Sequence, residues 1–251
     1  MDASRGPFDD FAIATAILTR LPVGARVAAD GDIAAAGWAF PLVGAGVGAL
    51  TALAFFVAAA LGCGNAAAAL IALGASLAVT GALHEDGLAD TVDGFGGGRT
   101  RDDKLSIMRD SRHGTFGILA LVLSIGLRAA ALGATGDPIH AALALIAAHA
   151  VSRGALPPLM RILPPAHSDG LGATAGRPSL PVAIIAAVLA AAIAIAVLGP
   201  GRGAVALLLT GGALALAAIL AQCQIGGYTG DVLGFFQQIG EIVMLLVAAA
   251  K

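Results

Sequence analysis

The feature that most constrains the fold of this chain is a series of apolar runs long enough to cross a lipid bilayer. Runs of about 18 or more apolar residues recur, and a helix needs about that length to cross a hydrocarbon core of about 30 Å. The mean hydropathy is +0.91. Alanine, leucine and glycine dominate without a regular alternation of polar and apolar residues, which favours helices over a closed barrel. We therefore predict an all-α fold, a polytopic membrane helical bundle embedded in a lipid bilayer.

The apolar runs predict about seven transmembrane helices and an N-terminal interfacial helix. The interfacial helix covers residues 8–22, a stretch that is short for a membrane span and carries charges at both ends. No linker divides the chain, so residues 1–251 are expected to form a single integral membrane domain. The predicted spans cover residues 35–61, 66–83, 115–133, 139–160, 180–199, 203–221 and 232–250.

The basic residues predict the orientation of these spans. Ten basic residues lie in the segments 1–34, 84–114 and 161–179, whereas only Arg202 and Lys251 fall on the other side. Loops rich in lysine and arginine stay in the cytoplasm. The segment 84–114 is therefore expected to face the cytoplasm, together with the loop 222–231. The ten residues are Arg5, Arg20, Arg26, Arg99, Arg101, Lys104, Arg109, Arg112, Arg161 and Arg177.

The most polar stretch of the chain, residues 83–99, has the spacing of a metal site. On a helix, Asp86, Asp90 and Asp93 lie at i, i+4 and i+7 and share one face. Three carboxylates on one stripe repel each other unless a cation lies between them, and Mg²⁺ prefers oxygen ligands. Glu85 points about 100° away from Asp86 and is a weaker ligand candidate. His84 could carry a proton or form an ordinary interfacial hydrogen bond.

A glycine-rich segment follows these carboxylates and could bind phosphate. Backbone N–H groups of consecutive glycines can point at an anion, and arginines add bidentate hydrogen bonds. Arg109 and Arg112, three residues apart, could hold one diphosphate. A flexible hinge after the helix and electrostatic anchoring of the next span are the alternatives for these segments. The glycine-rich segment consists of Gly96, Gly97, Gly98 and Arg99.

Four other charged residues stand out against the apolar background. Arg153 and Glu241 fall inside predicted spans, where a charge is costly and needs a partner. Arg153, Arg128 and the metal region are the candidate partners of Glu241. Asp169 lies in the loop 161–179, which could also be an ordinary turn, and Asp231 lies at a predicted helix start, where helix capping is the alternative.

The sequence also bears on partners. It contains no basic surface interleaved with aromatic residues, so nucleic acid is not an expected partner. Self-association into a homo-oligomer is left open by the sequence.

The polar segment and several other blocks resemble one known family. The run 83–98, Leu-His-Glu-Asp-Gly-Leu-Ala-Asp-Thr-Val-Asp-Gly-Phe-Gly-Gly-Gly, resembles the signature of the adenosylcobinamide-GDP ribazoletransferase family, also called cobalamin synthase. The sequence departs from the family pattern at two places, and neither is part of the carboxylate stripe. Glu85 stands where the family commonly has an apolar residue, and residues 110–113 lack a proline that is frequent in the family. Further blocks similar to the family lie at 19–23, 40–44, 107–117, 169–172 and 227–234.

The resemblance implies a multi-pass enzyme of the bacterial inner membrane with its active site facing the cytoplasm. Such an enzyme joins adenosylcobinamide-GDP to α-ribazole, or to α-ribazole 5′-phosphate, and releases GMP with Mg²⁺ as cofactor. Asp86, Asp90 and Asp93 would hold Mg²⁺, and one of them or His84 would accept the hydroxyl proton. The diphosphate and the pocket would be bound by Gly96, Gly97, Gly98, Arg99, Arg109, Arg112, Arg153, Asp169 and Asp231.

Two other functions use related features. A phospholipid head-group transferase of the CDP-alcohol type also cleaves a diphosphate with aspartates on membrane helices, but it has a different spacing and a further aspartate pair. A cation transporter with an acidic site would place its acids near the bilayer midplane and often shows inverted repeats, which we do not find.

Overall fold

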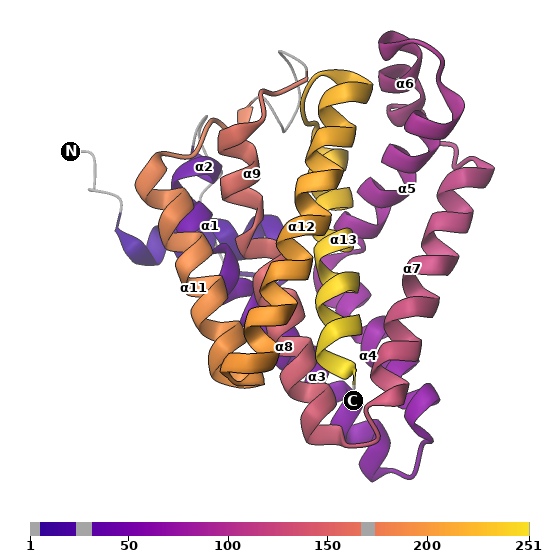
Figure 1. Cartoon of the computed structure of the whole chain (residues 1–251), viewed down its shortest axis with the longest axis vertical. Coiled ribbons are helices and arrows are strands. Elements are labelled where there is room, and N and C mark those ends of the chain that lie inside the picture. The colour runs from indigo at the N-terminus through magenta and orange to yellow at the C-terminus, as the bar shows by residue number, and fades with distance from the viewer. Residues whose placement is uncertain (1–5, 24–31, 167–173, 251) are drawn as a thin grey trace.

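The protein is a bundle of helices, and their long axes run mainly along the long dimension of the molecule (Figure 1). The computed structural model describes residues 6–23, 32–166 and 174–250. Within them there is no strand beyond an isolated bridge between Pro165 and Tyr228. The helices are α1 (Pro7–Leu18), α2 (Asp32–Ala36), the 3₁₀ helix η1 (Gly37–Ala39), α3 (Phe40–Ala60), α4 (Asn65–Thr80), α5 (Leu83–Gly97), α6 (Arg101–Met108), α7 (Thr115–Ala134), α8 (Pro138–Gly154), α9 (Leu156–Ile162), α11 (Leu180–Leu198), α12 (Pro200–Ile225) and α13 (Gly230–Ala249).

The predicted helical membrane bundle is confirmed. Six helical stretches of the described chain are long and apolar enough to cross a membrane, and the bent pair α4–α5 makes seven if it is one broken span. The predicted span 66–83 differs from the structure, because α4 has only 16 residues and the chain then bends by 92° into α5. The predicted loop 222–231 is also shorter than expected, since α12 continues to Ile225 and α13 begins at Gly230.

Glycines on α3 let this helix touch the backbone of α8. A methyl group added to Gly44 would lie 2.2 Å from the carbonyl oxygen of His149, and one added to Gly48 would lie 2.7 Å from the Cα atom of Ile146. Small residues at i and i+4 commonly bring membrane helices this close. The contact fixes α8 at the centre of the bundle, where its last two turns carry buried polar side chains.

The bend between α4 and α5 is made by two residues in the left-handed conformation. Gly81 ends α4 with φ of 67°, and Ala82 follows with φ of 56°. Glycine adopts this conformation freely, whereas alanine does so at a cost of about 1–2 kcal/mol. The bend turns α5 toward the same end of the molecule as α6 and the start of α7 (Figure 1).

The polar residues of α13 lie between two apolar clusters of the core. Phe235 and Phe236 belong to the cluster near the α6 end, and Met244 and Leu245 belong to the cluster at the opposite end. The residues between them include Gln237, Gln238 and Glu241, all buried. A buried polar layer therefore crosses the bundle beneath α5.

Candidate active site

Two aspartates of α5 and one histidine form a compact group at the end of the molecule that carries α6. One side-chain ligand atom from each of Asp86, Asp90 and His113 lies within 4.8 Å of the others. His113 Nδ1 is 3.8 Å from Asp90 Oδ1. Asp86 and Asp90 are one helical turn apart, so the i, i+4 spacing places them side by side as predicted. His113 comes from the loop before α7, 23 residues beyond Asp90 in the chain.

The start of α13 packs directly on this part of α5. A methyl group added to Gly87 would lie 2.6 Å from the carbonyl oxygen of Asp231, so only glycine allows this approach. Gly234 makes a similar contact with the backbone of His84. Asp231 therefore lies beside Asp86 and Asp90 on the facing end of α13. The start of α13 is capped by Thr229, whose hydroxyl accepts a hydrogen bond from Val232 N–H.

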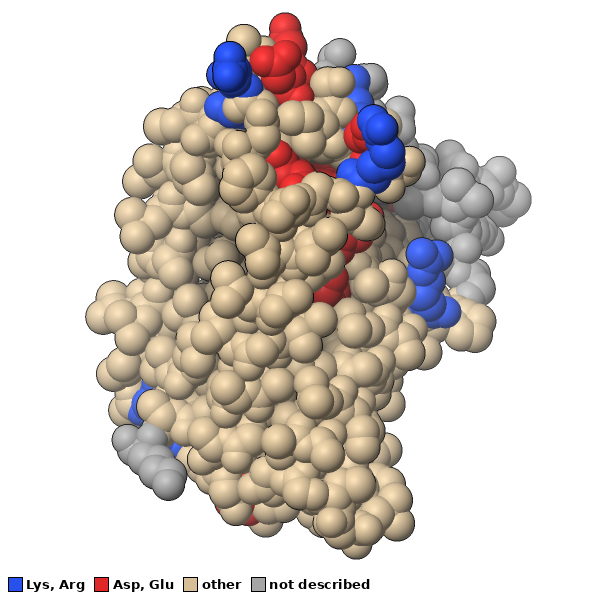
Figure 2. Space-filling model, turned by 90° about the vertical axis from the view of Figure 1, so that its right-hand side faces the viewer, with Lys and Arg blue, Asp and Glu red and all other residues tan. Residues whose placement is uncertain are grey.

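The carboxylates lie in a hollow rather than on a protruding surface. Figure 2 shows acidic atoms set back between other side chains in the upper part of this face, below acidic atoms that protrude at its top, and basic side chains lie nearby. Asp86 is exposed, whereas Asp90 and Asp231 are half-buried. Three carboxylates that converge in a recess partly shielded from water repel each other strongly, because the lower dielectric strengthens their interaction. A divalent cation would remove that repulsion.

Asp93 has a different environment from the one predicted. Its carboxylate is buried and accepts hydrogen bonds from Gly114 N–H at 2.6 Å and from Gly117 N–H at 2.8 Å. These N–H groups at the start of α7 have no acceptor within that helix, so the Asp93 carboxylate caps it from outside. Both glycines are in contact with the carboxylate, and a methyl group on either would lie 2.4 Å from an Asp93 oxygen. Asp93 is not part of the group formed by Asp86, Asp90 and His113, so we leave it out of the proposed ligand set.

Replacing Asp93 by alanine is expected to destabilise the protein by about 1–3 kcal/mol, since two N–H groups of α7 lose their acceptor. The loss would be measured by unfolding in sodium dodecyl sulfate. Asp90→Ala is the matched control on the same helix and should not lower stability, because its removal relieves repulsion. A native unfolding midpoint for Asp93→Ala would contradict the capping role.

Glu85, His84 and Arg153 lie beneath the recess and not in it. Glu85 Oε1 accepts hydrogen bonds from Arg128 Nη1 at 3.0 Å and from Gln238 Nε2 at 3.1 Å. His84 and Arg153 are both buried. The predictions of Glu85 as a metal ligand, His84 as a proton acceptor and Arg153 as a substrate contact therefore do not match their positions. The physical reason is the helical register, which points residues 84 and 85 into the bundle and residue 86 out of it.

The glycine-rich segment ends a helix instead of beginning one. Gly96 and Gly97 are in the last turn of α5, and Gly98 is its C-cap. A helix end presents carbonyl oxygens, so the predicted phosphate cradle of N–H groups does not form here. Gly98 serves close packing, because a methyl group on it would lie 2.6 Å from Lys104 N. Arg99, which follows, is exposed.

Arg109 and Arg112 lie in the segment that also carries His113. Both side chains are exposed. Arg112 forms an ion pair with Asp110 at 2.6 Å, and this contact lowers the pKa of the Asp110 carboxyl to about 2. The two arginines remain candidates for a substrate diphosphate at the rim of the recess. Asp169 lies outside the described residues.

His113 is the residue of this group that the sequence did not single out. Its only signal was its place in the block 107–117, beside two arginines. No local spacing relates it to Asp90, since the two meet through the packing of α7 on α5.

Comparisons with known proteins cover nearly the whole chain. A family model described as Cobalamin-5-phosphate synthase matches residues 10–249. A relative from Bradyrhizobium diazoefficiens is 51% identical over 247 residues, 98% of this chain and 95% of the relative. A relative from Mesorhizobium japonicum is 49% identical over 96% of this chain and 93% of its own length. A relative from Azorhizobium caulinodans is 44% identical over 94% of this chain and 94% of its own length. Each of the three is named adenosylcobinamide-GDP ribazoletransferase. No solved structure matches the chain.

Proposed function

This chain belongs to the cobalamin-5-phosphate synthase family, and on that premise we propose that it joins adenosylcobinamide-GDP to α-ribazole or α-ribazole 5′-phosphate and releases GMP. The chain is a transferase of the final stage of cobalamin synthesis. The observation that carries the finer proposal is the group formed by Asp86, Asp90 and His113 in a recess with arginines at its rim.

The reaction breaks a phosphoanhydride bond and forms a phosphodiester bond. A ribose hydroxyl of the ribazole attacks the phosphorus that is bonded to cobinamide, and the bond from this phosphorus to the bridging oxygen breaks. GMP leaves with that oxygen, and the hydroxyl proton passes to a base. Such transfers depend mainly on positioning and on neutralisation of charge on the diphosphate.

The donor atoms of the recess fit Mg²⁺. Asp86 and Asp90 supply carboxylate oxygens at one turn of spacing, and Asp231 lies beside them. Magnesium binds through one or two carboxylates and keeps other positions for water and substrate phosphate. When bound, Mg²⁺ would neutralise charge on the diphosphate.

The remaining residues would bind the substrate and move the proton. Mg²⁺ prefers oxygen ligands, so the imidazole nitrogen of His113 would not be needed to bind the metal ion. We therefore assign to His113 the role of the base that accepts the hydroxyl proton. Arg109 and Arg112 would hold the diphosphate through charge-assisted hydrogen bonds. The match over residues 10–249 favours this reaction over a head-group transferase or a cation transporter.

The experiment that tests the function follows GMP. Purified protein in liposomes would be mixed with adenosylcobinamide-GDP, α-ribazole and Mg²⁺, and GMP would be quantified with time. We expect GMP release that requires both substrates and stops when Mg²⁺ is chelated. Folded protein that releases no GMP would contradict the proposal.

We also propose that the recess faces the cytoplasm of a bacterium and that the protein lies in the inner membrane. The excess of basic residues on this side supports it. With the native Cys63 and Cys223 replaced by serine, single cysteines placed at Asp102, an exposed residue of α6, and at Gly62, between α3 and α4, would be treated with a membrane-impermeant maleimide on whole cells. We expect labelling at position 62 alone, and labelling at position 102 alone would reverse the orientation.

A further inference from the structure

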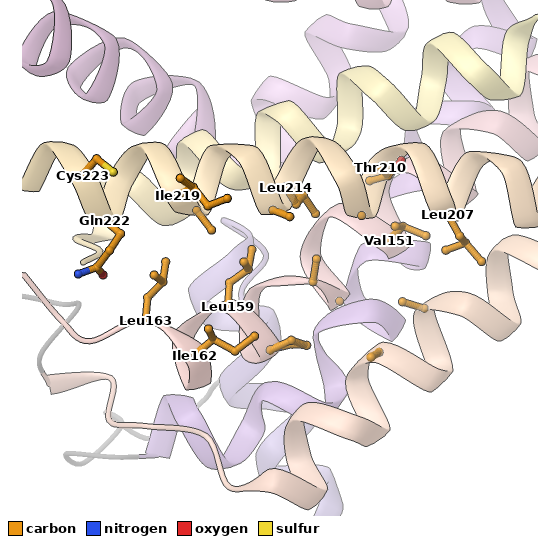
Figure 3. Close-up of a pocket in the computed structure, with 18 residues that line it drawn as sticks. Val151, Leu159, Ile162, Leu163, Leu207, Thr210, Leu214, Ile219, Gln222 and Cys223 are labelled. Atoms are coloured by element: carbon orange, nitrogen blue, oxygen red, sulfur yellow. The ribbon is translucent and has the colours of Figure 1, made fainter. Parts of the chain in front are cut away.

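The described part of the chain contains a large apolar groove that lies away from the acidic recess. It has a volume of about 620 Å³ and is lined by residues of α8, α9, α11 and α12 (Figure 3). A second groove of about 420 Å³ adjoins it, lined by residues of α9 and α11 and the segment before α11. The two grooves share Pro158, Ile162 and Ala187. They therefore form one branched surface with a common ridge at α9.

These grooves open on the outer surface of the bundle and extend through the depth of a lipid leaflet. Ile162 is 73% exposed, Ile219 is 60% exposed and Ile184 is 51% exposed. The larger groove follows α12 from Cys223 to Leu207, a helical distance of about 24 Å. Half of a hydrocarbon core is about 15 Å. The larger groove is thus long enough for an acyl chain.

Two arginines stand at one end of the second groove. Arg161 Nη1 donates a hydrogen bond to the carbonyl oxygen of Pro178 at 3.0 Å. Arg177 donates from Nε at 3.0 Å and from Nη2 at 2.7 Å to the carbonyl oxygen of Arg161. These bonds tie both arginine side chains to the backbone at the end of α9 and before α11. No carboxylate is among the residues that line the groove.

This end of the groove lies on the same side of the bundle as the acidic recess. The end of α9, the end of α12 and helix α6 all lie toward the top of Figure 1. The arginines are therefore at the membrane surface that carries most of the basic residues, where anionic lipid head groups attract cationic side chains.

We propose that this surface binds one anionic phospholipid, with its phosphate against Arg161 and Arg177 and its two acyl chains in the two grooves. Charge complementarity decides between the occupants of an apolar groove. A second copy of the chain docked through the same surface would bring two more arginines to the interface and no carboxylate from the groove. A lipid phosphate supplies the opposite charge, and the apolar lining matches the acyl chains. The site does not depend on the proposed reaction, because neither groove is lined by α5.

The test measures lipid retained by the purified protein. Native mass spectrometry would count bound lipid in titrations with phosphatidylglycerol and with phosphatidylcholine of identical acyl chains. We expect one phosphatidylglycerol to bind preferentially. Arg161→Gln together with Arg177→Gln should lower that preference about 30-fold, because each arginine near the surface contributes about fivefold. Arg20→Gln, an exposed arginine on the same side, should leave it unchanged.

A second pair of variants tests the grooves without altering charge. Ala187 lines both grooves, and Ala187→Trp should therefore lower the binding of both lipids. The neighbouring Val188 is 59% exposed and lines neither groove, so Val188→Trp should bind lipid as the native chain does. Equal binding of the two lipids, an unchanged preference in the arginine variant, or full lipid binding by Ala187→Trp would each overturn the proposal. Competition by inorganic phosphate at the lipid concentration would assign the arginines to a free anion instead.

Discussion

Replacing Asp90 by asparagine is expected to lower the turnover number for GMP release by about 1,000-fold. Asp90 lies between Asp86 and His113, within reach of both. The substitution removes one negatively charged ligand of the proposed Mg²⁺ site. It also removes the carboxylate that lies beside His113. Loss of a single group that stabilises transition-state charge typically lowers rates by about 100- to 1,000-fold. We expect the upper end of this range, because Asp90 would also be a ligand of the metal ion. A factor of 1,000 equals about 4 kcal/mol of barrier.

The measurement is single-turnover GMP release in liposomes over a range of Mg²⁺ concentrations. Asp102→Asn is the matched control, because Asp102 is an exposed acid on α6 outside the recess. The control should keep native turnover, and both proteins should unfold at native denaturant concentrations. Turnover of Asp90→Asn within tenfold of the native value would remove Asp90 from the ion site.

The separate roles of Asp86, Asp90 and Asp93 show how far helical spacing predicts a site. The i, i+4 relation of Asp86 and Asp90 is local, and α5 forms over both as predicted. Asp93 also fits the stripe, yet its carboxylate binds Gly114 and Gly117 at the start of α7. That contact joins residues more than 20 positions apart, and helical periodicity contains no information about it. His113 was missed for the same reason.

The membrane spans were predictable because each is specified by its own length and hydropathy. The bend after α4 was not predictable from the sequence. It depends on the left-handed conformation of Ala82, and nothing in the surrounding apolar sequence indicates that conformation. Among the partners proposed for Glu241, the structure selects both arginines over the metal region: Arg128 at 2.9 Å and Arg153 at 3.6 Å. The high cost of an isolated charge in a membrane made a partner predictable, and packing decided which.

Glu241→Gln is expected to cost about 3–5 kcal/mol of stability, a large share of the stability of an ordinary domain. Glu241 is 1% exposed and contacts Arg128, Arg153, His149 and Gln237. The described network contains two carboxylates, Glu85 and Glu241, and two guanidinium groups, so its formal charge is balanced. The substitution leaves one buried positive charge unpaired while keeping the size of the side chain.

A charge-balanced double variant separates this electrostatic cost from a packing defect. Arg153→Met combined with Glu241→Gln removes one charge of each sign and keeps the Glu85–Arg128 pair at 3.0 Å. We expect the double variant to recover at least half of the stability lost by Glu241→Gln, because removing both members of a buried pair is often neutral. Unfolding in sodium dodecyl sulfate would give the four free energies of the double-mutant cycle. Additive losses from the two substitutions would show that Arg153 and Glu241 do not act as a pair. Because α5 carries Glu85 one residue before Asp86, a loss of this network should also lower turnover when the protein is still folded.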